Sequence, residues 1–149
     1  MKKRIFEGCA TAIITPMHED GSVNEQAFMD LVEQQIKGGI DALVVCGTTG
    51  ESAVLTHEEH TRVIEIAIKQ AAGRVPIIAG TGSNDTDYAI DLTKYACEVG
   101  ADAVLLVTPY YNKATQKGLI QHFTTVADSV SIPVILYNVP GRTGCNILP

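Results

Sequence analysis

Three short segments of the sequence bring together hydroxyl groups and one guanidinium group. Backbone amides in a glycine-flanked turn, together with threonine hydroxyls, can hold a small carboxylate or phosphate. A phenol next to a hydroxyl can pass a proton in either direction, which suits carbonyl and imine chemistry, and a planar guanidinium matches a second carboxylate. The set therefore indicates a site for small oxo-acids. The segments are "GTTGES" with Thr48 and Thr49, "TPYYNK" with Tyr110 and Tyr111, and "YNVPGRTG" with Tyr137 and Arg142.

The set lacks a nucleophile, for which a Schiff-base lysine is the natural candidate. We expect none of the internal lysines to lie at a strand end facing the interior, although Lys113 comes nearest, in a loop. His57 and His60 lie three residues apart, but no third metal ligand accompanies them, so we interpret them as helix-start residues and expect no metal. The lysines considered are Lys37, Lys69, Lys94, Lys113 and Lys117.

Five nearly continuous apolar runs alternate with segments of helical periodicity. The runs read as strands buried on both faces, which is typical of a parallel sheet. Between them, apolar residues recur at helical spacing. The strand runs are residues 9–16, 41–47, 75–82, 101–109 and 132–140, and the helical positions include Phe28, Leu31, Val32 and Ile36, then Val63, Ile64, Ala67 and Ile68.

Helix ends are also predicted by the sequence. "SVNE" at residues 22–25 and "THEE" at residues 56–59 fit the capping box, in which a hydroxyl and a carboxylate satisfy free amides at a helix start. Glycines after Ile36 and before Ala101 predict helix stops. Asn146 and Pro149 resemble the cap region of a further helix.

The resulting βαβαβαβαβ order admits an open doubly wound sheet or a (β/α)8 barrel. The first strand-to-helix junction, "TPMHEDGS", lacks the G-x-G-x-x-G motif of a dinucleotide-binding sheet, so we favour the barrel. A complete TIM barrel takes about 250 residues. We therefore expect residues 1–149 to form the N-terminal part of a single barrel domain, covering about four βα units and the fifth strand. In such folds, reactive groups follow the carboxyl ends of strands, where all three segments lie.

Composition narrows the class of partner. The chain is 46% apolar and 19% charged, with a net charge of -6. It lacks the clustered Lys and Arg that nucleic acids or anionic membranes require, so small molecules or other subunits are the expected partners. Four dispersed cysteines without a C-x-x-C pair suggest a reduced compartment. Glu7 interrupts the first apolar stretch and Pro16 ends it, so we expect no signal peptide and a cytoplasmic protein.

At this point "GTTGES", "PYYNK" and "YNVPGRTG", in this order and at these intervals, resemble the dihydrodipicolinate synthase family. The resemblance runs from about Gly8 to the last residue. It implies a TIM-barrel lyase of the class I aldolase type, without a cofactor, that condenses pyruvate with L-aspartate 4-semialdehyde through a lysine Schiff base. This reaction belongs to the diaminopimelate and lysine biosynthesis branch of amino-acid biosynthesis. A cytoplasmic homo-oligomer, a dimer or a homotetramer, is also implied.

The resemblance implies a role for each matching residue. The turn of Thr48 and Thr49 holds the pyruvate carboxylate, and Tyr137 is the general acid and base beside the imine. Thr48 links Tyr137 to Tyr111 in a proton relay, and Tyr111 is contributed to the site of a neighbouring subunit. Arg142 binds the carboxylate of the second substrate. The Schiff-base lysine of the family lies on strand 6, beyond residue 149, so the isolated chain is expected to be inactive.

The family's regulatory site for L-lysine offers a further expectation. The residues that match its lining are Ser52, Ala53, His57, His60, Asn84 and Tyr110. Tyr88 occupies the place where an inhibited enzyme often carries a glutamate, so tight lysine binding is not expected here.

Two alternatives stay open. One is a catalytically silent half-barrel that acts as an assembly module through its exposed strand edges. The other is a different pyruvate-dependent aldolase of the same superfamily.

Overall fold

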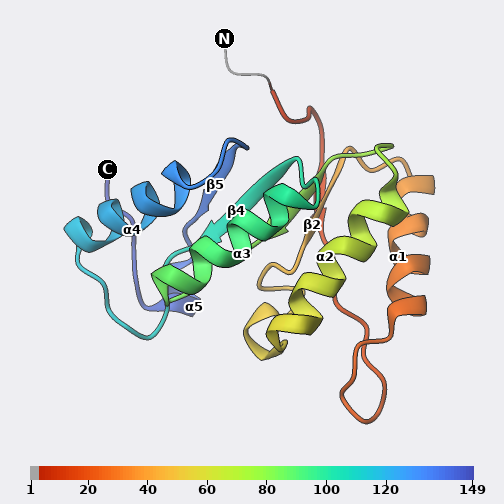
Figure 1. Cartoon of the computed structure of the whole chain (residues 1–149), viewed down its shortest axis with the longest axis horizontal. Coiled ribbons are helices and arrows are strands. Elements are labelled where there is room, and N and C mark those ends of the chain that lie inside the picture. Colours follow the sequence, from red (N-terminus) through yellow and green to blue (C-terminus); the bar gives the residue numbers. More distant parts are fainter. Residues whose placement is uncertain (1–3) are drawn as a thin grey trace.

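The computed structural model describes residues 4–149. Its five parallel strands form one sheet in the order β1-β2-β3-β4-β5, so each strand pairs with its neighbour in the sequence. Figure 1 shows the helices alternating with these strands along the chain. The strands are β1 (Ala10–Ala12), β2 (Ala42–Val45), β3 (Ile77–Gly80), β4 (Ala103–Val107) and β5 (Val134–Tyr137). The helices are α1 (Glu25–Lys37), η1 (Ser52–Val54), α2 (His57–Ala71), α3 (Thr86–Glu98), α4 (Gln116–Asp128) and α5 (Pro140–Thr143).

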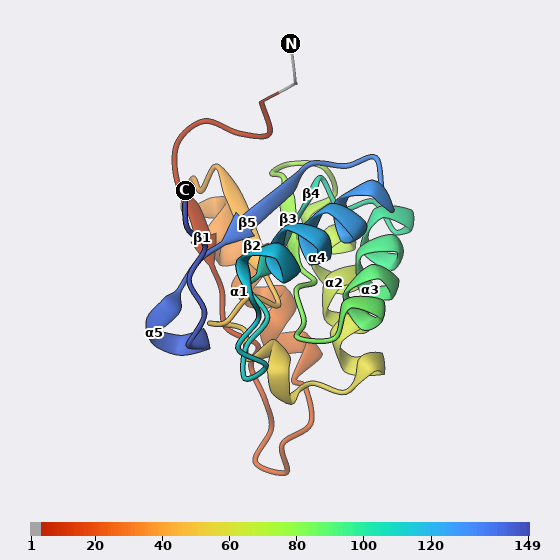
Figure 2. The same cartoon turned by 90° about the vertical axis from the view of Figure 1, so that its left-hand side faces the viewer.

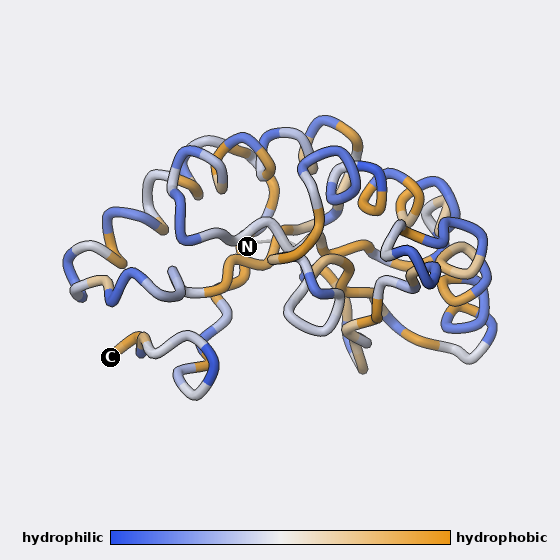
Figure 3. The backbone as a smooth tube through the Cα atoms, turned by 90° about the horizontal axis from the view of Figure 1, so that it is seen from below, coloured by the Kyte–Doolittle hydropathy of each residue, from blue (hydrophilic) through white to orange (hydrophobic). Residues whose placement is uncertain are grey.

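The four long helices cover one face of the sheet. Seen from below, the backbone forms an arc with polar helices along its outer rim and apolar strands inside it (Figure 3). Each long helix packs on the next, α1 on α2, α2 on α3 and α3 on α4, as the turned view in Figure 2 also shows. A doubly wound sheet instead has helices on both faces and a strand order that reverses. The prediction of a half-barrel is therefore confirmed, and the doubly wound alternative is wrong.

The core lies between the sheet and the helices, as the apolar runs predict. Phe28 and Val32 of α1 and Val63 and Ile64 of α2 are fully buried, together with Leu43 of β2. The five strands are shorter than the apolar runs that predict them, and Ile13, Cys46 and Thr108, which lie just beyond strand ends, are also buried. Burial of about 1.5–3 kcal/mol per large apolar side chain makes this layer the main source of stability.

One predicted capping box is confirmed and the other is wrong. Thr56 begins α2, its hydroxyl accepts a bond from the Glu59 amide, and the Glu59 carboxylate accepts one from the Thr56 amide. Helix α1 begins instead at Asn24, whose side chain accepts from the Ala27 amide at 3.0 Å. The hydroxyl of Ser22 is engaged by Asp20 in a tight turn, so it cannot cap the helix.

The glycine stops are confirmed at the ends of α1 and α3. Gly39 and Gly100 have φ values of 85° and 99°, a left-handed conformation that glycine adopts without a steric penalty. Helix α5 was not predicted by the sequence, and the further helix expected from Asn146 and Pro149 stays a prediction. Within residues 4–149, no helix is long and apolar enough to cross a membrane.

Candidate active site

A tight turn follows β2 and presents both predicted threonines. The Gly50 amide bonds to the Gly47 carbonyl at 3.0 Å, which closes the turn around Thr48 and Thr49. Both hydroxyl residues are exposed. Two non-glycine residues with positive φ flank the turn, Cys46 at 52° and Glu51 at 56°. Strained backbone of this kind persists only where the surroundings hold it.

Three buried contacts hold this turn in place. Gly80 at the end of β3 lies so close that a Cβ atom there would stand 2.1 Å from the Cys46 carbonyl oxygen. The His60 ring bonds to the Gly80 carbonyl at 2.8 Å, and the Thr15 hydroxyl donates to the Gly50 carbonyl at 2.7 Å. Burial raises the pKa of the Cys46 thiol to about 12, so this group stays protonated and supports the turn as an apolar side chain.

A hollow of about 210 Å³ opens beside the turn at the carboxyl end of the sheet. It brings together Thr48 from the loop after β2, Tyr110 from the loop after β4, and Arg142 from α5. A smaller hollow of about 20 Å³ is lined by Tyr137 and also by Thr48. Thr48 therefore lines both hollows, as do Ser52 and Val107. The remaining lining of the larger hollow consists of Glu51, Ser52, Ala53, Val107, Val139 and Thr143.

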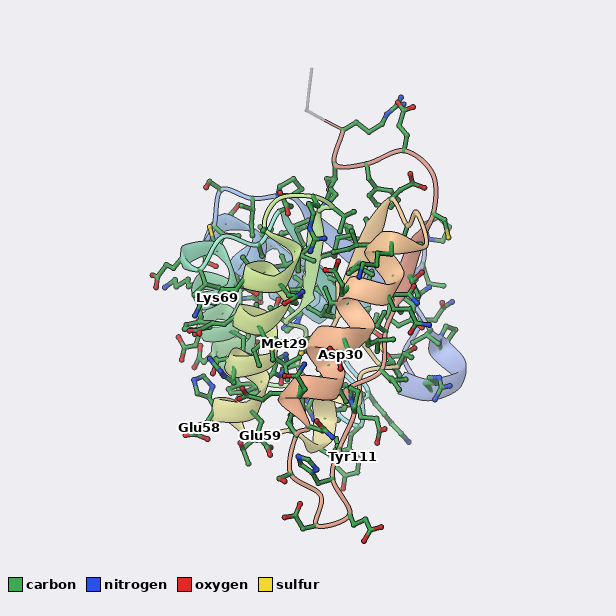
Figure 4. The ribbon with its side chains drawn as sticks, turned by 90° about the vertical axis from the view of Figure 1, so that its right-hand side faces the viewer. Met29, Asp30, Glu58, Glu59, Lys69 and Tyr111 are labelled. Carbon is green, nitrogen blue, oxygen red and sulfur yellow. The ribbon has the colours of Figure 1, made fainter. Side chains whose placement is uncertain are left out.

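Tyr111 and Thr49 are not among the residues that line either hollow. Tyr111 has a φ of 71° and 89% of its surface is exposed. Figure 4 shows it at the end of the molecule where α2 starts with Glu58 and Glu59. The loop that carries it is held by Asn112, whose side-chain amide donates to the Asn84 carbonyl at 2.8 Å. Tyr111 is therefore presented outward from a fixed loop.

Arg142 lies in the short helix α5, and a pair of buried hydroxyls that sequence analysis missed lies behind it. The Thr108 hydroxyl donates to the Thr143 hydroxyl at 3.1 Å, and the Thr108 amide donates to the Tyr137 carbonyl at 3.1 Å. Thr108 is the first residue of "TPYYNK" and Thr143 lies within "PGRTG", and this position inside the motifs was the only signal in the sequence. The pair joins the ends of β4 and β5 to the helix that carries the guanidinium.

The residues predicted to line a lysine-binding site are divided between several places. Ser52, Ala53 and Tyr110 line the larger hollow, and Asn84 bonds to Asn112. The His57 ring packs edge-on against Tyr88 with centroids 5.8 Å apart. Burial raises the pKa of the Tyr88 phenol and lowers the pKa of the His60 ring, although the hydrogen bond that the ring donates to the Gly80 carbonyl opposes the second shift. His60 points at backbone rather than at the hollow, and the regulatory role of the set stays a prediction.

The lysines are distributed as the sequence predicts. Lys37, Lys69, Lys94 and Lys117 lie on helices α1 to α4, and Lys113 lies in the loop after β4. Among the described residues, no group of three or more His, Cys, Asp or Glu side chains is placed to hold a metal ion.

Five consecutive parallel strands with helices on one face, and a hollow lined by hydroxyls and a guanidinium at their carboxyl ends, define the class of protein as one half of a TIM barrel with a candidate active site. The family model for the dihydrodipicolinate synthetase family matches residues 5–149. The chain therefore belongs to that family.

Individual relatives agree with this assignment. The 4-hydroxy-tetrahydrodipicolinate synthase of Lachnoclostridium phytofermentans is 61% identical over 145 residues, which are 97% of this chain and 49% of the relative. The crystal structure of dihydrodipicolinate synthase from Aquifex aeolicus matches with a TM-score of 0.92 and 56% identity, covering 95% of this chain and 48% of that one. The chloride-inhibited enzyme from Acinetobacter baumannii, complexed with pyruvate, matches with a TM-score of 0.93 and 54% identity over 97% of this chain and 49% of that one. The chain spans about half the length of these relatives.

Proposed function

We propose that this chain supplies the N-terminal half of a 4-hydroxy-tetrahydrodipicolinate synthase, which condenses pyruvate with L-aspartate 4-semialdehyde. The single observation that carries the proposal is the shared position of Thr48 between the hollow that contains Arg142 and the hollow that contains Tyr137. The binding of pyruvate by the related enzyme of Acinetobacter baumannii supports the choice of first substrate.

The chemistry requires an amine that these residues do not provide. A lysine amine attacks the pyruvate carbonyl and loses water, which gives an imine. Loss of a methyl proton gives an enamine, whose carbon attacks the aldehyde carbon while the aldehyde oxygen takes up a proton. We assign this lysine to a sixth strand beyond residue 149, because the described lysines lie on helices and in one loop.

The residues of this chain bind the substrates and move protons. The turn of Thr48 and Thr49 offers backbone amides and hydroxyls to the pyruvate carboxylate. Tyr137 gives and takes the proton at the imine, and the Thr48 hydroxyl passes it on towards the Tyr111 phenol of a neighbouring subunit. Arg142 binds the carboxylate of the aldehyde by donating two parallel hydrogen bonds to it. Neutral hydroxyls suit this route because each both donates and accepts.

Borohydride reduction tests the proposal. The product of the complete open reading frame, incubated with pyruvate and borohydride, is expected to gain a stable adduct on a lysine beyond residue 149. Residues 1–149 expressed alone are expected to gain none. Absence of an adduct from the complete product, or an adduct on Lys113, contradicts the proposal.

The half-barrel alternative is favoured by one observation. Ile14 after β1 and Leu136 of β5 are 53% and 48% exposed at the two edges of the sheet. Unpaired edges of this kind promote association. A complete product that forms no adduct but assembles through these edges would favour the assembly module. Turnover of pyruvate with a different aldehyde would favour another aldolase of the superfamily.

We extend the proposal to assembly and location. The outward position of Tyr111 supports a homo-oligomer, a dimer or tetramer, in which it enters a neighbouring site. The described cysteines are all free thiols, which fits a reduced, cytoplasmic compartment. We also propose that residues 1–149 belong to one barrel domain, and that the predicted regulatory set binds L-lysine weakly because Tyr88 brings no negative charge.

A further inference from the structure

We propose that Thr108 and Thr143 are positioning residues that fix Arg142 against Tyr137 and thereby set the affinity for the aldehyde substrate. The inference rests on the proposed function for its substrate and on the contacts below for its geometry. Neither residue belongs to the site predicted from the sequence.

The direction of the hydrogen bonds is determined by their acceptors. The Thr143 hydroxyl lies 3.0 Å from the Cys145 carbonyl and 3.2 Å from the Val139 carbonyl, which can only accept, so Thr143 must donate to one of them. Its single proton is then used. The Thr108 hydroxyl, 3.1 Å away, must therefore be the donor to Thr143, and the Cys145 amide donates to the same oxygen at 3.3 Å.

Both hydroxyls are enclosed by protein, with exposed fractions of 0% for Thr108 and 8% for Thr143. Water therefore cannot easily replace either partner, and loss of one hydroxyl leaves the other short of a bond. In either choice of acceptor for Thr143, the Thr108 hydroxyl donates to the Thr143 oxygen. This arrangement couples the end of β4 to the segment after β5.

Helix α5 depends on outside contacts for its placement. It has four residues, and its N-cap residue Val139 makes no side-chain capping bond. A helix of this length is not stable by itself. The Thr143 hydroxyl lies within hydrogen-bonding distance of the Val139 and Cys145 carbonyls at the two ends of this turn, and it accepts from Thr108.

Thr108 also contacts the strand that carries the general acid and base. Its amide donates to the Tyr137 carbonyl at 3.1 Å, so one residue orients both Tyr137 and, through Thr143, the neighbouring Arg142. The guanidinium and the phenol belong to different hollows joined by Thr48. The backbone and the hydroxyl of Thr108 thus link the two segments that carry them.

The test uses Thr108→Val, which keeps the shape and removes the hydroxyl, and Thr108→Ser, which keeps the hydroxyl. In the complete enzyme, Thr108→Val is expected to raise the KM for L-aspartate 4-semialdehyde about five- to tenfold, the size of one net hydrogen bond. The KM for pyruvate is expected to stay within about twofold, because this substrate is bound by the threonine turn. Thr108→Ser restores the aldehyde KM. Thr125→Val, which removes an exposed hydroxyl bonded only within α4, is the matched control and changes neither KM.

A second measurement is independent of activity. Amide hydrogen exchange at Arg142, Thr143 and Gly144 is expected to quicken about five- to tenfold in Thr108→Val and in Thr143→Val, and to stay unchanged in Thr125→Val. Unchanged exchange, an equal rise of both KM values, or failure of Thr108→Ser to restore the aldehyde KM overturns the inference. An enzyme that does not turn over these substrates overturns the proposed function instead, while the exchange data still decide whether the hydroxyl pair positions α5.

Discussion

The Nε2 atom of His60 donates a hydrogen bond to the carbonyl oxygen of Gly80 at 2.8 Å, and both residues are buried. Since Gly80 lies against the backbone of Cys46 and Gly47, this bond fixes the end of β3 where the threonine turn begins. His60→Ala is expected to lower the free energy of unfolding by about 2–4 kcal/mol, through a lost bond and a cavity. Denaturant titration measures it. His60→Gln, which retains an N–H donor, should lose less, and an equal loss would contradict the role of the bond.

The same histidine makes stability depend on pH. Burial lowers the pKa of His60 below its ordinary value of 6.5, and the Gly80 carbonyl only partly opposes this. The unfolded chain then binds the proton more readily, so the stability contribution is complete above about pH 6.5 and falls as the pH drops towards the folded-state pKa. Burial lowers the pKa of His122 as well. Denaturation between pH 7.5 and pH 5 should therefore show a slope that His60→Gln reduces without abolishing.

Gly80 has no room for a side chain. A Cβ atom there would stand 2.1 Å from the Cys46 carbonyl oxygen, whereas at Gly141 it would meet no atom within 4 Å. Gly80→Ala is expected to destabilise the protein by about 1–3 kcal/mol or more and to lower activity, because the threonine turn must move. Gly141→Ala should stay within about 0.5 kcal/mol. Thermal unfolding compares the two variants. Equal unfolding midpoints would show that the close approach of Gly80 to Cys46 does not exclude a side chain.

Thr48 is predicted to pass protons without binding the imine itself. Thr48→Val is expected to lower kcat about 100-fold or more, the effect of losing a group in general acid and base catalysis. Adduct formation with borohydride should persist at saturating pyruvate. Steady-state kinetics measures kcat, and mass spectrometry detects the adduct. Thr48→Ser should recover most of kcat, and an inactive serine variant would indicate a packing role.

Arg142 is predicted to bind only the second substrate. Arg142→Ala is expected to lower kcat/KM for L-aspartate 4-semialdehyde about 100-fold, through loss of a charge-assisted pair of hydrogen bonds. Arg142→Lys keeps the charge but not the planar fork, so its kcat/KM should lie between those of the unchanged enzyme and Arg142→Ala. The rate of pyruvate adduct formation should be unchanged in both variants. If adduct formation fell in parallel with kcat/KM, the assignment of Arg142 to the aldehyde site would be wrong.

Tyr111 is predicted to enter the site of a neighbouring subunit. Since 89% of it is exposed in a single chain, Tyr111→Ala should leave the monomer intact. The same change is expected to weaken self-association about tenfold or more, as for a buried aromatic anchor. Sedimentation at several protein concentrations measures the dissociation constant of the oligomer. Ile120→Ala, at an exposed apolar position of α4, is the control for loss of apolar surface.

The sequence predicted the elements better than their ends. The apolar runs located all five strands because strands buried on both faces leave an unbroken apolar signature. Ser22 looked like a helix cap, but Asp20 engages its hydroxyl, so Asn24 caps α1 instead. Helix α5 could not be predicted from local pattern, because its four residues depend on contacts with Thr108.

The site could be predicted where a residue of suitable chemistry directly follows a predicted strand. Thr48 and Arg142 follow strands, and parallel strands end at one edge, so their meeting in one hollow follows from topology. The burial of His60 was not predicted, since it was interpreted as a helix-start residue, although it continues the helical spacing of Val63 and Ala67. The Thr108 and Thr143 pair could be found only in the structure. No sequence pattern shows whether a hydroxyl at a strand end is buried and hydrogen-bonded or exposed to solvent.

The order of the strands also bears on how the chain acquires its fold. Every ladder joins a strand to the next one along the polypeptide, from β1 with β2 to β4 with β5. Within residues 4–149, each strand therefore finds its partner in the preceding βα unit, about 30 residues earlier in the chain. The layer can therefore grow one unit at a time during synthesis, each new strand adding to a template that is already in place.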